Sequence, residues 1–378
     1  MILHIATDEK WIDLAYNQFE NVSPNNNKVV ILTEKNSVEY IKKTPFKTLR
    51  QDQITKQALN QLFENVSAVV LHSIDILNFK ISIPNQLKVI WIGFGFDYYD
   101  FIYKDTNKLL LPKTSHLKKK LIKFDFRMKI KKLAAINWLI EKLKGRELKL
   151  NYIKKIDYFV PVINDEYKLI KNNHSGYFPE FIDWNYGTLE DDLVRGFENK
   201  TIDANNILIG NSATFTNNHI ETFDLLSHCN IKGRKIICPL SYGNESYGDE
   251  ITNLGRGLFG SDFQPLKEFM EIDDYIQTIS SCSIVILNHV RQQAVGNIIT
   301  MLYLGAKVFL REENPLYTYY KNEGAKIFSI SELVQDPNLI NSNLTDDDIE
   351  QNRIFLRKLY SRIVIKHKTE ILIQKLLN

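Results

Sequence analysis

The stretch Ile207–Thr214, with the sequence ILIGNSAT, decides the fold class of the second half of the chain. An apolar, β-rich run ends there in Gly210-Asn211-Ser212, and a helical pattern follows. A strand that leads through small polar residues into a helix is the repeating unit of doubly wound parallel sheets, and its turn presents backbone N–H groups that suit a phosphate. A simple turn, with Thr216 or Asn218 capping the helix, explains the same residues equally well. The stretch therefore predicts an α/β lobe and makes Asn211 and Ser212 candidate phosphate contacts.

Similar β-rich runs, bounded by turn residues and separated by helical patterns, recur along the whole chain. The candidate strands are Ile2–Thr7, Lys28–Thr33, Ala68–His72, Val89–Gly93 and Tyr158–Val162 in the first half, and Asn206–Gly210, Lys235–Leu240, Ser283–Leu287, Lys307–Leu310 and Ala325–Phe328 in the second. Neither the helical nor the strand periodicity continues through residues 172–187, which predicts a boundary between two lobes there. We expect an α/β protein with two Rossmann-like lobes facing a cleft, one over residues 1–180 and one over 181–345, followed by a C-terminal helical segment over 346–378.

The composition is that of a soluble globular protein, with 378 residues of which 44% are hydrophobic and 25% charged. The three cysteines show no Cys-x-x-Cys spacing, which argues against a zinc site and against a disulfide framework. The N-terminus lacks a basic region before its apolar run, and no apolar stretch approaches the roughly 20 residues of a membrane span. We therefore expect a cytoplasmic protein in a reducing compartment.

Positive charge is concentrated in residues 117–133, where lysine and arginine alternate with apolar side chains. Such a segment is typical of a helix that lies on an anionic membrane surface, although a solvated helix face would look the same. The net charge of +3 is too small to imply nucleic-acid binding, and no recognised nucleic-acid-binding fold accompanies the segment. The expected partner is an anionic membrane rather than a nucleic acid.

A second polar corner follows the strand at Ser283–Leu287 and leads into an apolar helix. Arg291 can pair bidentately with a diphosphate, and the start of the helix adds its partial positive charge to the same anion. Gln292 and Gln293 lie beside it, and Gly296 would let the helix approach a ligand closely or would pack the helix against the sheet. These residues predict a diphosphate site, in which Arg291 would stabilise the charge that develops in a reaction.

Two further loops follow strands of the second half. A carboxylate just beyond a strand can accept hydrogen bonds from ribose hydroxyls, and either Glu312 or Glu313 could fill this position. Negative charge at the helix N-terminus around Pro315 is the alternative interpretation for one of the pair. Tyr242 could stack on a base, although a surface loop would have the same composition.

The first half contains two candidates for a catalytic base. Asp97 lies in Trp91–Tyr98, WIGFGFDY, which reads as a glycine-flexed loop that projects this carboxylate toward the cleft. Asp8, at the end of the first strand, is the competing candidate. Either could act on an acceptor hydroxyl within hydrogen-bond reach, and a capping role for either is the alternative interpretation.

The segments WIGFGFD, ILIGNSATFTNNHIE, PLSYGNESYGDEI, RQQAVGN and REENP, taken in this order, cover most of residues 89–320. Together they resemble the bacterial 4-acetamido-4,6-dideoxygalactose (Fuc4NAc) transferase family, which completes the trisaccharide lipid of enterobacterial common antigen. The resemblance implies a GT-B glycosyltransferase of the cytoplasmic face of the inner membrane, acting without a metal on a dTDP-sugar donor and a polyprenyl-diphosphate-linked acceptor.

The same resemblance implies that the second lobe holds the donor around Asn211, Ser212, Tyr242, Arg291, Gln292, Gln293 and Glu313, and that the first lobe holds the acceptor. The residues themselves leave open whether the donor is linked to UDP or to dTDP, and no cofactor beyond the donor is expected. A nucleotide-sugar epimerase of the same architecture and a non-catalytic nucleotide-sugar-binding protein are the alternative functions. Product analysis with donor alone separates the epimerase from the transferase.

Overall fold

The computed structural model describes residues 1–35, 37–79, 81–129 and 147–378. By their contacts, these residues divide into two compact units. Unit 1 comprises residues 1–104, 147–192 and 359–378, and unit 2 comprises residues 105–129 and 193–358.

Unit 1 is built on a parallel sheet of seven strands in the order β3-β2-β1-β4-β5-β6-β7. The strands are β1 (Ile2–Ala6), β2 (Asn27–Thr33), β3 (Phe46–Arg50), β4 (Ala68–His72), β5 (Lys88–Ile92), β6 (Tyr158–Val160) and β7 (Glu180–Phe181). The α-helices described in this unit are α1 (Ile12–Val22), α2 (Lys56–Leu62), α3 (Tyr99–Ile102), α6 (Asn164–Asn173) and α14 (Arg362–Leu377). The strand order reverses between β1 and β4, which makes the carboxyl ends of these two strands the expected binding position.

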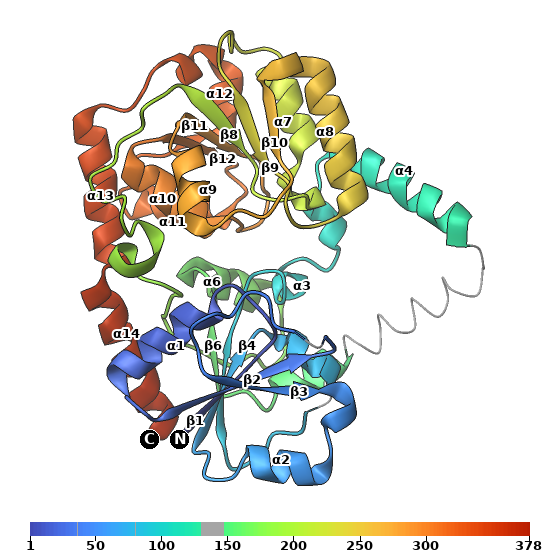
Figure 1. Cartoon of the computed structure of the whole chain (residues 1–378), viewed down its shortest axis with the longest axis vertical. Coiled ribbons are helices and arrows are strands. Elements are labelled where there is room, and N and C mark those ends of the chain that lie inside the picture. The colour runs from blue at the N-terminus through green and yellow to red at the C-terminus, as the bar shows by residue number, and fades with distance from the viewer. Residues whose placement is uncertain (36, 80, 130–146) are drawn as a thin grey trace. The chain divides into compact units, whose positions relative to one another are not determined.

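The core of unit 1 joins the two ends of the chain. Every residue of β1 and β4 is buried, as expected for the central strands of a parallel sheet that is covered on both faces. Phe19 of α1 and Trp184 pack there with Leu372 and Leu376 of the C-terminal helix. Figure 1 shows α14 in red beside α1 in blue, close to both termini.

Unit 2 contains a second parallel sheet, with six strands in the order β10-β9-β8-β11-β12-β13. The strands are β8 (Asn206–Ile209), β9 (Ile236–Pro239), β10 (Phe263–Leu266), β11 (Cys282–Leu287), β12 (Lys307–Leu310) and β13 (Phe328–Ser329). Its α-helices are α4 (Pro112–Lys129), α7 (His219–Leu226), α8 (Glu245–Phe259), α9 (Ile272–Ile279), α10 (Val295–Leu304), α11 (Pro315–Asn322), α12 (Ile330–Gln335) and α13 (Asp346–Tyr360). Here the strand order reverses between β8 and β11.

These sheets confirm the predicted fold class of two Rossmann-like lobes with a C-terminal helical segment, and each predicted strand overlaps an observed one. The sequence did not predict β3, β7 and β10. All three lie at or beside an edge of their sheet, where the apolar pattern is weakest: β3 has no buried residue, β7 has two residues, and β10 contains Pro265.

The two compact units are not made of the consecutive ranges 1–180, 181–345 and 346–378 into which the sequence was divided, because each unit contains segments from separate parts of the chain. Residues 105–129 belong to unit 2 although they precede β6, and the chain leaves unit 1 after Asp192. The C-terminal helical segment is divided, because α13 packs in unit 2 and α14 in unit 1.

The basic segment 117–133 lies partly in α4, and residues 130–133 lie outside the described residues. Leu117 is buried and Leu121 packs on the core of unit 2, so these two apolar side chains are not available to a membrane surface. Ile122 remains exposed. Part of the apolar face in the first turns of the segment is therefore used for packing in unit 2, and the membrane contact of the segment stays a prediction.

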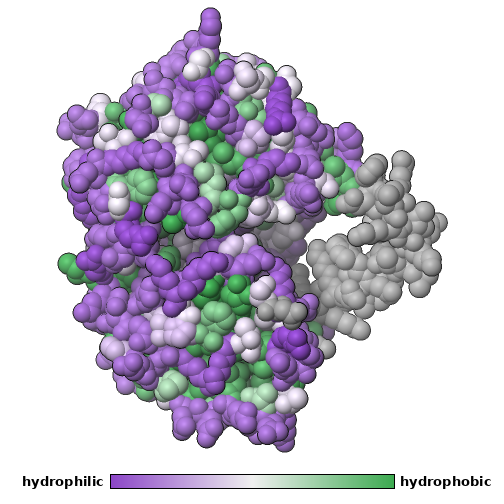
Figure 2. Space-filling view, in the orientation of Figure 1, coloured by the Kyte–Doolittle hydropathy of each residue, from purple (hydrophilic) through white to green (hydrophobic). Residues whose placement is uncertain are grey.

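No helix within the described ranges combines the length and apolar character needed to cross a membrane. The face of the protein in Figure 2 is largely hydrophilic, and hydrophobic side chains gather on it in small groups over each unit.

Candidate functional site

The candidate site in unit 2 lies at the carboxyl ends of β8 and β11, the neighbouring strands between which the strand order reverses. β8 is followed directly by Gly210, whose φ of 60° lies in the left-handed region that favours glycine. A Cβ atom at this position would lie 2.5 Å from Nε2 of His219. Glycine is therefore required for the tight turn that brings Asn211 and Ser212 over the sheet.

Four of the predicted donor-site residues meet at this edge. Gln293 donates from Nε2 to Oδ1 of Asn211 over 2.8 Å, and Asn211 donates from Nδ2 to the hydroxyl of Tyr242 over 2.8 Å. Gln293 also contacts Oγ of Ser212 at 3.5 Å, and its Oε1 accepts from Oγ1 of Thr216 at 2.7 Å. The loops after β8, β9 and β11 thus form one polar surface, in which Thr216 takes part as a side-chain donor.

A layer of buried polar residues supports this surface. Oδ1 of Asn217 accepts from the Asn211 backbone N–H and from Nε2 of His289, each over 2.8 Å. Burial lowers the pKa of His289 well below its ordinary value, with Arg291 and His219 adding to the shift, so the ring is neutral. His289 therefore supports the loop after β8 through its hydrogen bond to Asn217.

Asn218 joins three segments of unit 2 instead of capping α7. It occupies the N-cap position in a left-handed conformation, but its side chain makes no capping hydrogen bond. Its Oδ1 accepts from the Leu111 backbone N–H over 2.9 Å, and its Nδ2 donates to the carbonyl of Asn288 over 2.9 Å. The alternative interpretation of this residue as a helix cap is wrong, because partners distant in the sequence take up its side chain.

Tyr242 is placed by a close contact between two loops. The Ala213 backbone N–H donates to the Tyr242 carbonyl, and the Asn244 N–H donates back to the Ala213 carbonyl, each over 2.8 Å. Gly243, with φ of 120°, permits this approach, since a Cβ there would lie 2.6 Å from the Ala213 carbonyl group. The Tyr242 side chain is 45% exposed, so its ring is accessible beside Asn211.

Arg291 is half-buried at the start of the loop that leads into α10. Its Nη1 donates to the Gln292 carbonyl over 2.8 Å, and its own carbonyl accepts from Nδ2 of Asn314 over 3.0 Å. Burial raises the pKa of the Tyr242 hydroxyl, whereas hydrogen bonds with Ser212 and Asn211 and, to a smaller extent, the charge of Arg291 act in the opposite direction. Arg291 therefore lies within electrostatic range of the Asn211–Tyr242–Gln293 surface.

The helix that follows begins directly after an unusual backbone conformation. Ala294, the N-cap of α10, has φ of 63°, a left-handed conformation that costs a non-glycine residue about 1–2 kcal/mol. Gly296 lies half-buried in the first turn of this helix. Because strained backbone persists where the surroundings enforce it, the turn is consistent with a binding loop.

The two candidate ribose-binding carboxylates have different surroundings. Oε1 of Glu313 accepts from Nη2 of Arg311 over 2.6 Å, whereas Oε2 of Glu312 accepts from Ser331 over 2.9 Å. Burial alone would raise the pKa of Glu313, but the hydrogen bond and charge of Arg311 outweigh it and the pKa is lowered. Arg311 also donates to Oδ1 of Asn288 over 3.1 Å, so it connects the ends of β11 and β12.

Sequence reasoning missed the part played by Arg311. Its Nε is buried and has no hydrogen-bond partner among the described residues. The sequence signal that could have revealed this role is an arginine that directly follows a strand and precedes two glutamates.

In unit 1, Asp97 does not project outward as the sequence suggested. The side chain is 1% exposed, and its carboxylate accepts from Nε1 of Trp91 and from the backbone N–H groups of Phe94 and Ile74 over 2.8–3.1 Å. Burial raises its pKa despite these three hydrogen bonds. The geometry favours the capping interpretation, because Phe94 of the same loop occupies one carboxylate oxygen and Trp91 and Ile74 occupy the other.

Asp8 is used in the same way. Its two carboxylate oxygens accept from the backbone N–H groups of Glu39 and Tyr40, which ties the loop after β2 to the end of β1. This arrangement also favours a capping role over a catalytic one.

Glu9, the residue after Asp8, was not among the catalytic bases proposed from the sequence. Burial raises its pKa to about 7, and the charges of Asp8, Asp75 and Asp97 act in the same direction, while Lys10 opposes them. Glu9 follows β1 at the edge where the strand order of unit 1 reverses. A carboxyl group that titrates near neutral pH is suited to general acid–base chemistry.

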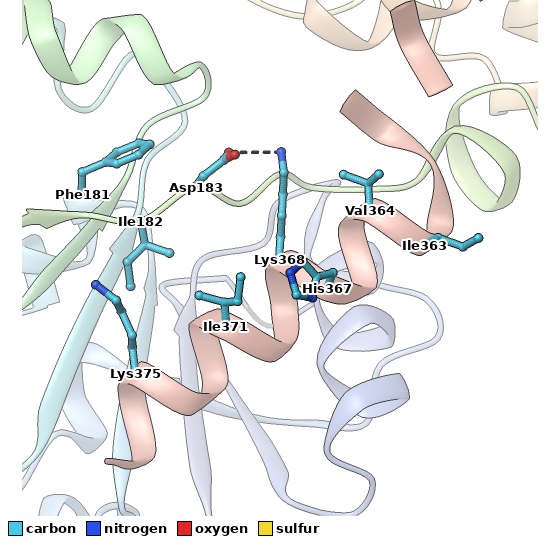
Figure 3. A pocket seen from close by; sticks show the side chains of 9 residues that line it. All are labelled: Phe181, Ile182, Asp183, Ile363, Val364, His367, Lys368, Ile371 and Lys375. Carbon is cyan, nitrogen blue, oxygen red and sulfur yellow. Dashed lines mark hydrogen bonds and ion pairs between the residues drawn. The ribbon is translucent and has the colours of Figure 1, made fainter. Parts of the chain in front are cut away.

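A groove of about 530 Å³ lies elsewhere on unit 1, between α14 and the strand end at Phe181. Figure 3 shows Lys368 reaching from the helix to Asp183 across this groove, at 3.1 Å. Lys375 is likewise paired with Glu180. The groove contains none of the predicted site residues.

Among the described side chains, no group of three or more histidine, cysteine, aspartate or glutamate residues is arranged to hold a metal ion. The predicted independence from metals stays a prediction.

Comparison with known proteins decides the family. The family described as 4-alpha-L-fucosyltransferase glycosyl transferase group 56 matches residues 167–360, slightly more than half of the chain. The chain belongs to this glycosyltransferase family. The matched region contains every predicted donor-site residue, from Asn211 to Glu313.

Solved structures with the same fold include other proteins of two-sheet architecture. Sucrose-phosphate synthase from Thermosynechococcus elongatus matches with a TM-score of 0.63 at 10% identity, over 99% of this chain and 98% of the other. HepE of Anabaena, in complex with UDP and glucose, matches with a TM-score of 0.64 at 8% identity over the whole of both chains. A glycosyltransferase from Rickettsia africae gives a TM-score of 0.63 at 13% identity, over 100% of this chain and 98% of the other. The protein is thus a glycosyltransferase with the GT-B fold.

Proposed function

We propose that this glycosyltransferase moves a deoxy-amino sugar such as Fuc4NAc from a nucleotide diphosphate donor to a lipid-linked saccharide in surface-polysaccharide synthesis. The observation that carries the proposal is the polar surface of Asn211, Tyr242 and Gln293 at the carboxyl ends of β8 and β11, with Arg291 beside it. HepE, which shares the fold, has been solved with UDP-glucose, and this supports a nucleotide-sugar donor. The sugar and the acceptor follow from the family resemblance of the motifs.

In this proposal the diphosphate lies over the loop before α10. Arg291 supplies a cation, the first backbone N–H groups of α10 supply donors, and Asn211 and Ser212 complete the surface. As the bond between sugar and phosphate breaks, negative charge grows on the diphosphate leaving group. Hydrogen-bond donors that are already in position stabilise this charge without having to move, and the proposed mechanism uses no metal.

Glu313 is the candidate for the ribose hydroxyls. Its salt bridge to Arg311 keeps the carboxylate ionised, and an ionised carboxylate is the better hydrogen-bond acceptor. Glu312 is the weaker candidate, since Ser331 already donates to it. Tyr242, with its exposed ring, would stack on the base.

The acceptor hydroxyl must lose a proton when it attacks the sugar. We assign this proton to Glu9, because the carboxylates of Asp97 and Asp8 are engaged by backbone donors. With a pKa of about 7, Glu9 is partly ionised at neutral pH and can accept the proton. The acceptor side of the reaction would then belong to unit 1.

A lipid-linked acceptor would bring the enzyme to the cytoplasmic face of the inner membrane. The lysines of segment 117–133 support this location through attraction to anionic headgroups. Lys119 and Lys120 are exposed, whereas Leu117 packs inward, so the attraction is proposed to be electrostatic.

Arg291→Ala is the decisive variant. Wild-type protein should melt at a higher temperature with UDP or dTDP present, because a ligand that binds only the folded state stabilises it. The Arg291→Ala variant should lose most of this shift and lower donor turnover about 10²–10³-fold, while its melting temperature without ligand stays unchanged.

Arg256→Ala, which removes an exposed arginine of α8, is the matched control and should behave like wild type. Donor incubated without acceptor should stay a single nucleotide sugar, since epimerisation would point to a different enzyme. Equal nucleotide shifts in wild type and in Arg291→Ala would remove Arg291 from the site.

A further inference from the structure

Three aromatic rings are stacked in a row beside the carboxyl end of β5 in unit 1. Phe96 lies 6.0 Å from Phe94 with 8° between the ring planes, and Phe94 lies 5.2 Å from Tyr186 with 15° between the planes. Phe96 is 52% exposed, Phe94 and Tyr186 are half-buried, and Tyr186 contacts buried Trp184. The row therefore leads from the core to an aromatic face in solvent.

The row is anchored at its inner ring, Tyr186, and at its middle ring, Phe94. The Tyr186 hydroxyl pairs with Nδ1 of buried His72 at 2.7 Å, and Nε2 of His72 pairs with His4 at 3.0 Å. On the other side, Asp97 accepts from the Phe94 backbone N–H over 2.8 Å. Gly95, with φ of 93°, provides the bend between the two phenylalanines.

Phe96, which is exposed and stacked on Phe94, is a preorganised contact surface for a ligand. A ring on a mobile loop would have to be ordered on binding, whereas this ring is already ordered by its neighbours, and the entropic cost of binding is smaller. The stacking also keeps the ring from folding back onto the loop. The buried Asp97 network therefore has a purpose beyond capping, because it fixes the backbone of Phe94, the ring on which Phe96 stacks.

The row lies next to hydrogen-bonding groups. Burial raises the pKa of the Tyr186 hydroxyl, and the charges of Asp97 and Glu9 add to the shift, so both carboxyls lie within electrostatic range of the inner end of the row. Glu9 follows β1, and Phe94 and Phe96 follow β5, so these groups lie on the same edge of the sheet. An aromatic face bordered by a carboxylate matches a pyranose ring, which has an apolar C–H face and a rim of hydroxyls.

We propose that Phe96, supported by Phe94, is the platform on which a pyranose unit of the acceptor stacks, with its hydroxyls directed to Glu9. This inference rests on the proposed function and deepens it, since it makes a sugar ring, rather than the lipid, the part of the acceptor that unit 1 recognises. A prenyl chain would need a longer apolar groove, and it would desolvate the carboxyl group of Glu9 without compensation.

Binding of simple glycosides tests the proposal without a donor or an acceptor lipid. The probes are methyl pyranosides of glucose, galactose, N-acetylglucosamine and glucuronic acid, with farnesyl phosphate as the prenyl probe, and saturation-transfer NMR is the measurement. At least one pyranoside should receive saturation mainly on the C–H protons of one ring face. Phe96→Ala should weaken its Kd about tenfold, the loss expected for one stacked ring, and Phe96→Tyr should retain it.

Phe46→Ala removes another exposed phenylalanine of unit 1 and should leave binding unchanged. Binding that survives Phe96→Ala, binding of farnesyl phosphate alone at Phe96, or no binding by any pyranoside would each overturn the platform. The thermal shift with UDP or dTDP is independent of these outcomes, so a failed platform is distinguishable from a failed donor site.

Discussion

At the scale of single residues, Glu9 illustrates how position changes chemistry. A glutamate on the surface has a pKa of about 4.5, whereas burial and three nearby carboxylates raise the pKa of Glu9 to about 7. Between these two pH values the folded protein holds a proton that the unfolded chain releases. The stability that Glu9 contributes is therefore present at low pH and is lost as the pH rises through 7.

Glu9→Gln should consequently raise the free energy of unfolding at pH 8 by about 1–2 kcal/mol, after allowance for solvent screening, with a smaller effect at pH 5. Urea unfolding at the two pH values measures the difference. Glu39→Gln, at a side chain that is 53% exposed, serves as the control and should show no comparable dependence on pH. If Glu9 is also the base, transfer by the wild type should rise through pH 7, and the glutamine variant should lose this rise together with most of its activity. A stability gain that is the same at pH 5 and pH 8 would contradict the assignment.

At the scale of elements, α4 shows how polar contacts fix a helix to its unit. The Thr114 backbone N–H and hydroxyl donate to the two carboxylate oxygens of Glu221 on α7, over 2.9 and 2.6 Å. Thr114 is fully buried, and Leu117 one turn later enters the core of unit 2. A buried hydroxyl without its acceptor is costly, so this pair of hydrogen bonds contributes more than a surface ion pair would.

Glu221→Ala should destabilise unit 2 by about 2 kcal/mol, because it leaves both donors of Thr114 unpaired in a buried position. Hydrogen exchange of the amides in the first turns of α4 should accelerate, which mass spectrometry of peptides can follow. The control is Lys113→Ala, which removes the exposed ion pair between Lys113 and Asp224 and should cost less than about 0.5 kcal/mol. Unchanged exchange in the glutamate variant would mean that apolar packing alone holds the helix.

At the scale of the whole molecule, the chain passes between the two units more than once. Unit 1 contains the first residues and the last, and its core brings Ile2 together with Leu372 and Leu376. Nε1 of Trp184 donates to Oγ1 of Thr369 over 2.9 Å, which adds a buried hydrogen bond between α14 and the segment after β7. Unit 1 is thus incomplete until α14 has been added to it.

Leu372→Ala should destabilise unit 1 by about 3 kcal/mol, the cost of removing a fully buried leucine side chain and leaving a cavity. Hydrogen exchange resolved along the sequence should show faster exchange in β1, β4 and α1, with unit 2 unaffected. Ile363→Ala, on the same helix but 83% exposed, should change little. Equal protection of unit 1 in wild type and in Leu372→Ala would show that α14 is dispensable for its core.

From the sequence alone we could predict the fold class and most of the residues that meet at the carboxyl ends of β8 and β11. Apolar strand runs alternating with helices specify parallel sheets, and polar residues directly after strands must meet at the carboxyl edge of the sheet. This is why Asn211, Tyr242 and Gln293 could be nominated from local pattern, and why they lie within hydrogen-bond distance of one another. Their roles toward a donor stay predictions.

Only the tertiary structure decided the acceptor side and the course of the chain between the units. Asp97 is enclosed by Trp91 and by the backbone of its own and a neighbouring loop. Burial, together with the charges of Asp8, Asp75 and Asp97, raises the pKa of Glu9 to about 7. The assignments of α4 and α14 depend on partners as distant as Glu221 and Trp184. Desolvation and long-range hydrogen bonding depend on which segments surround a group, and local periodicity carries no information about those neighbours.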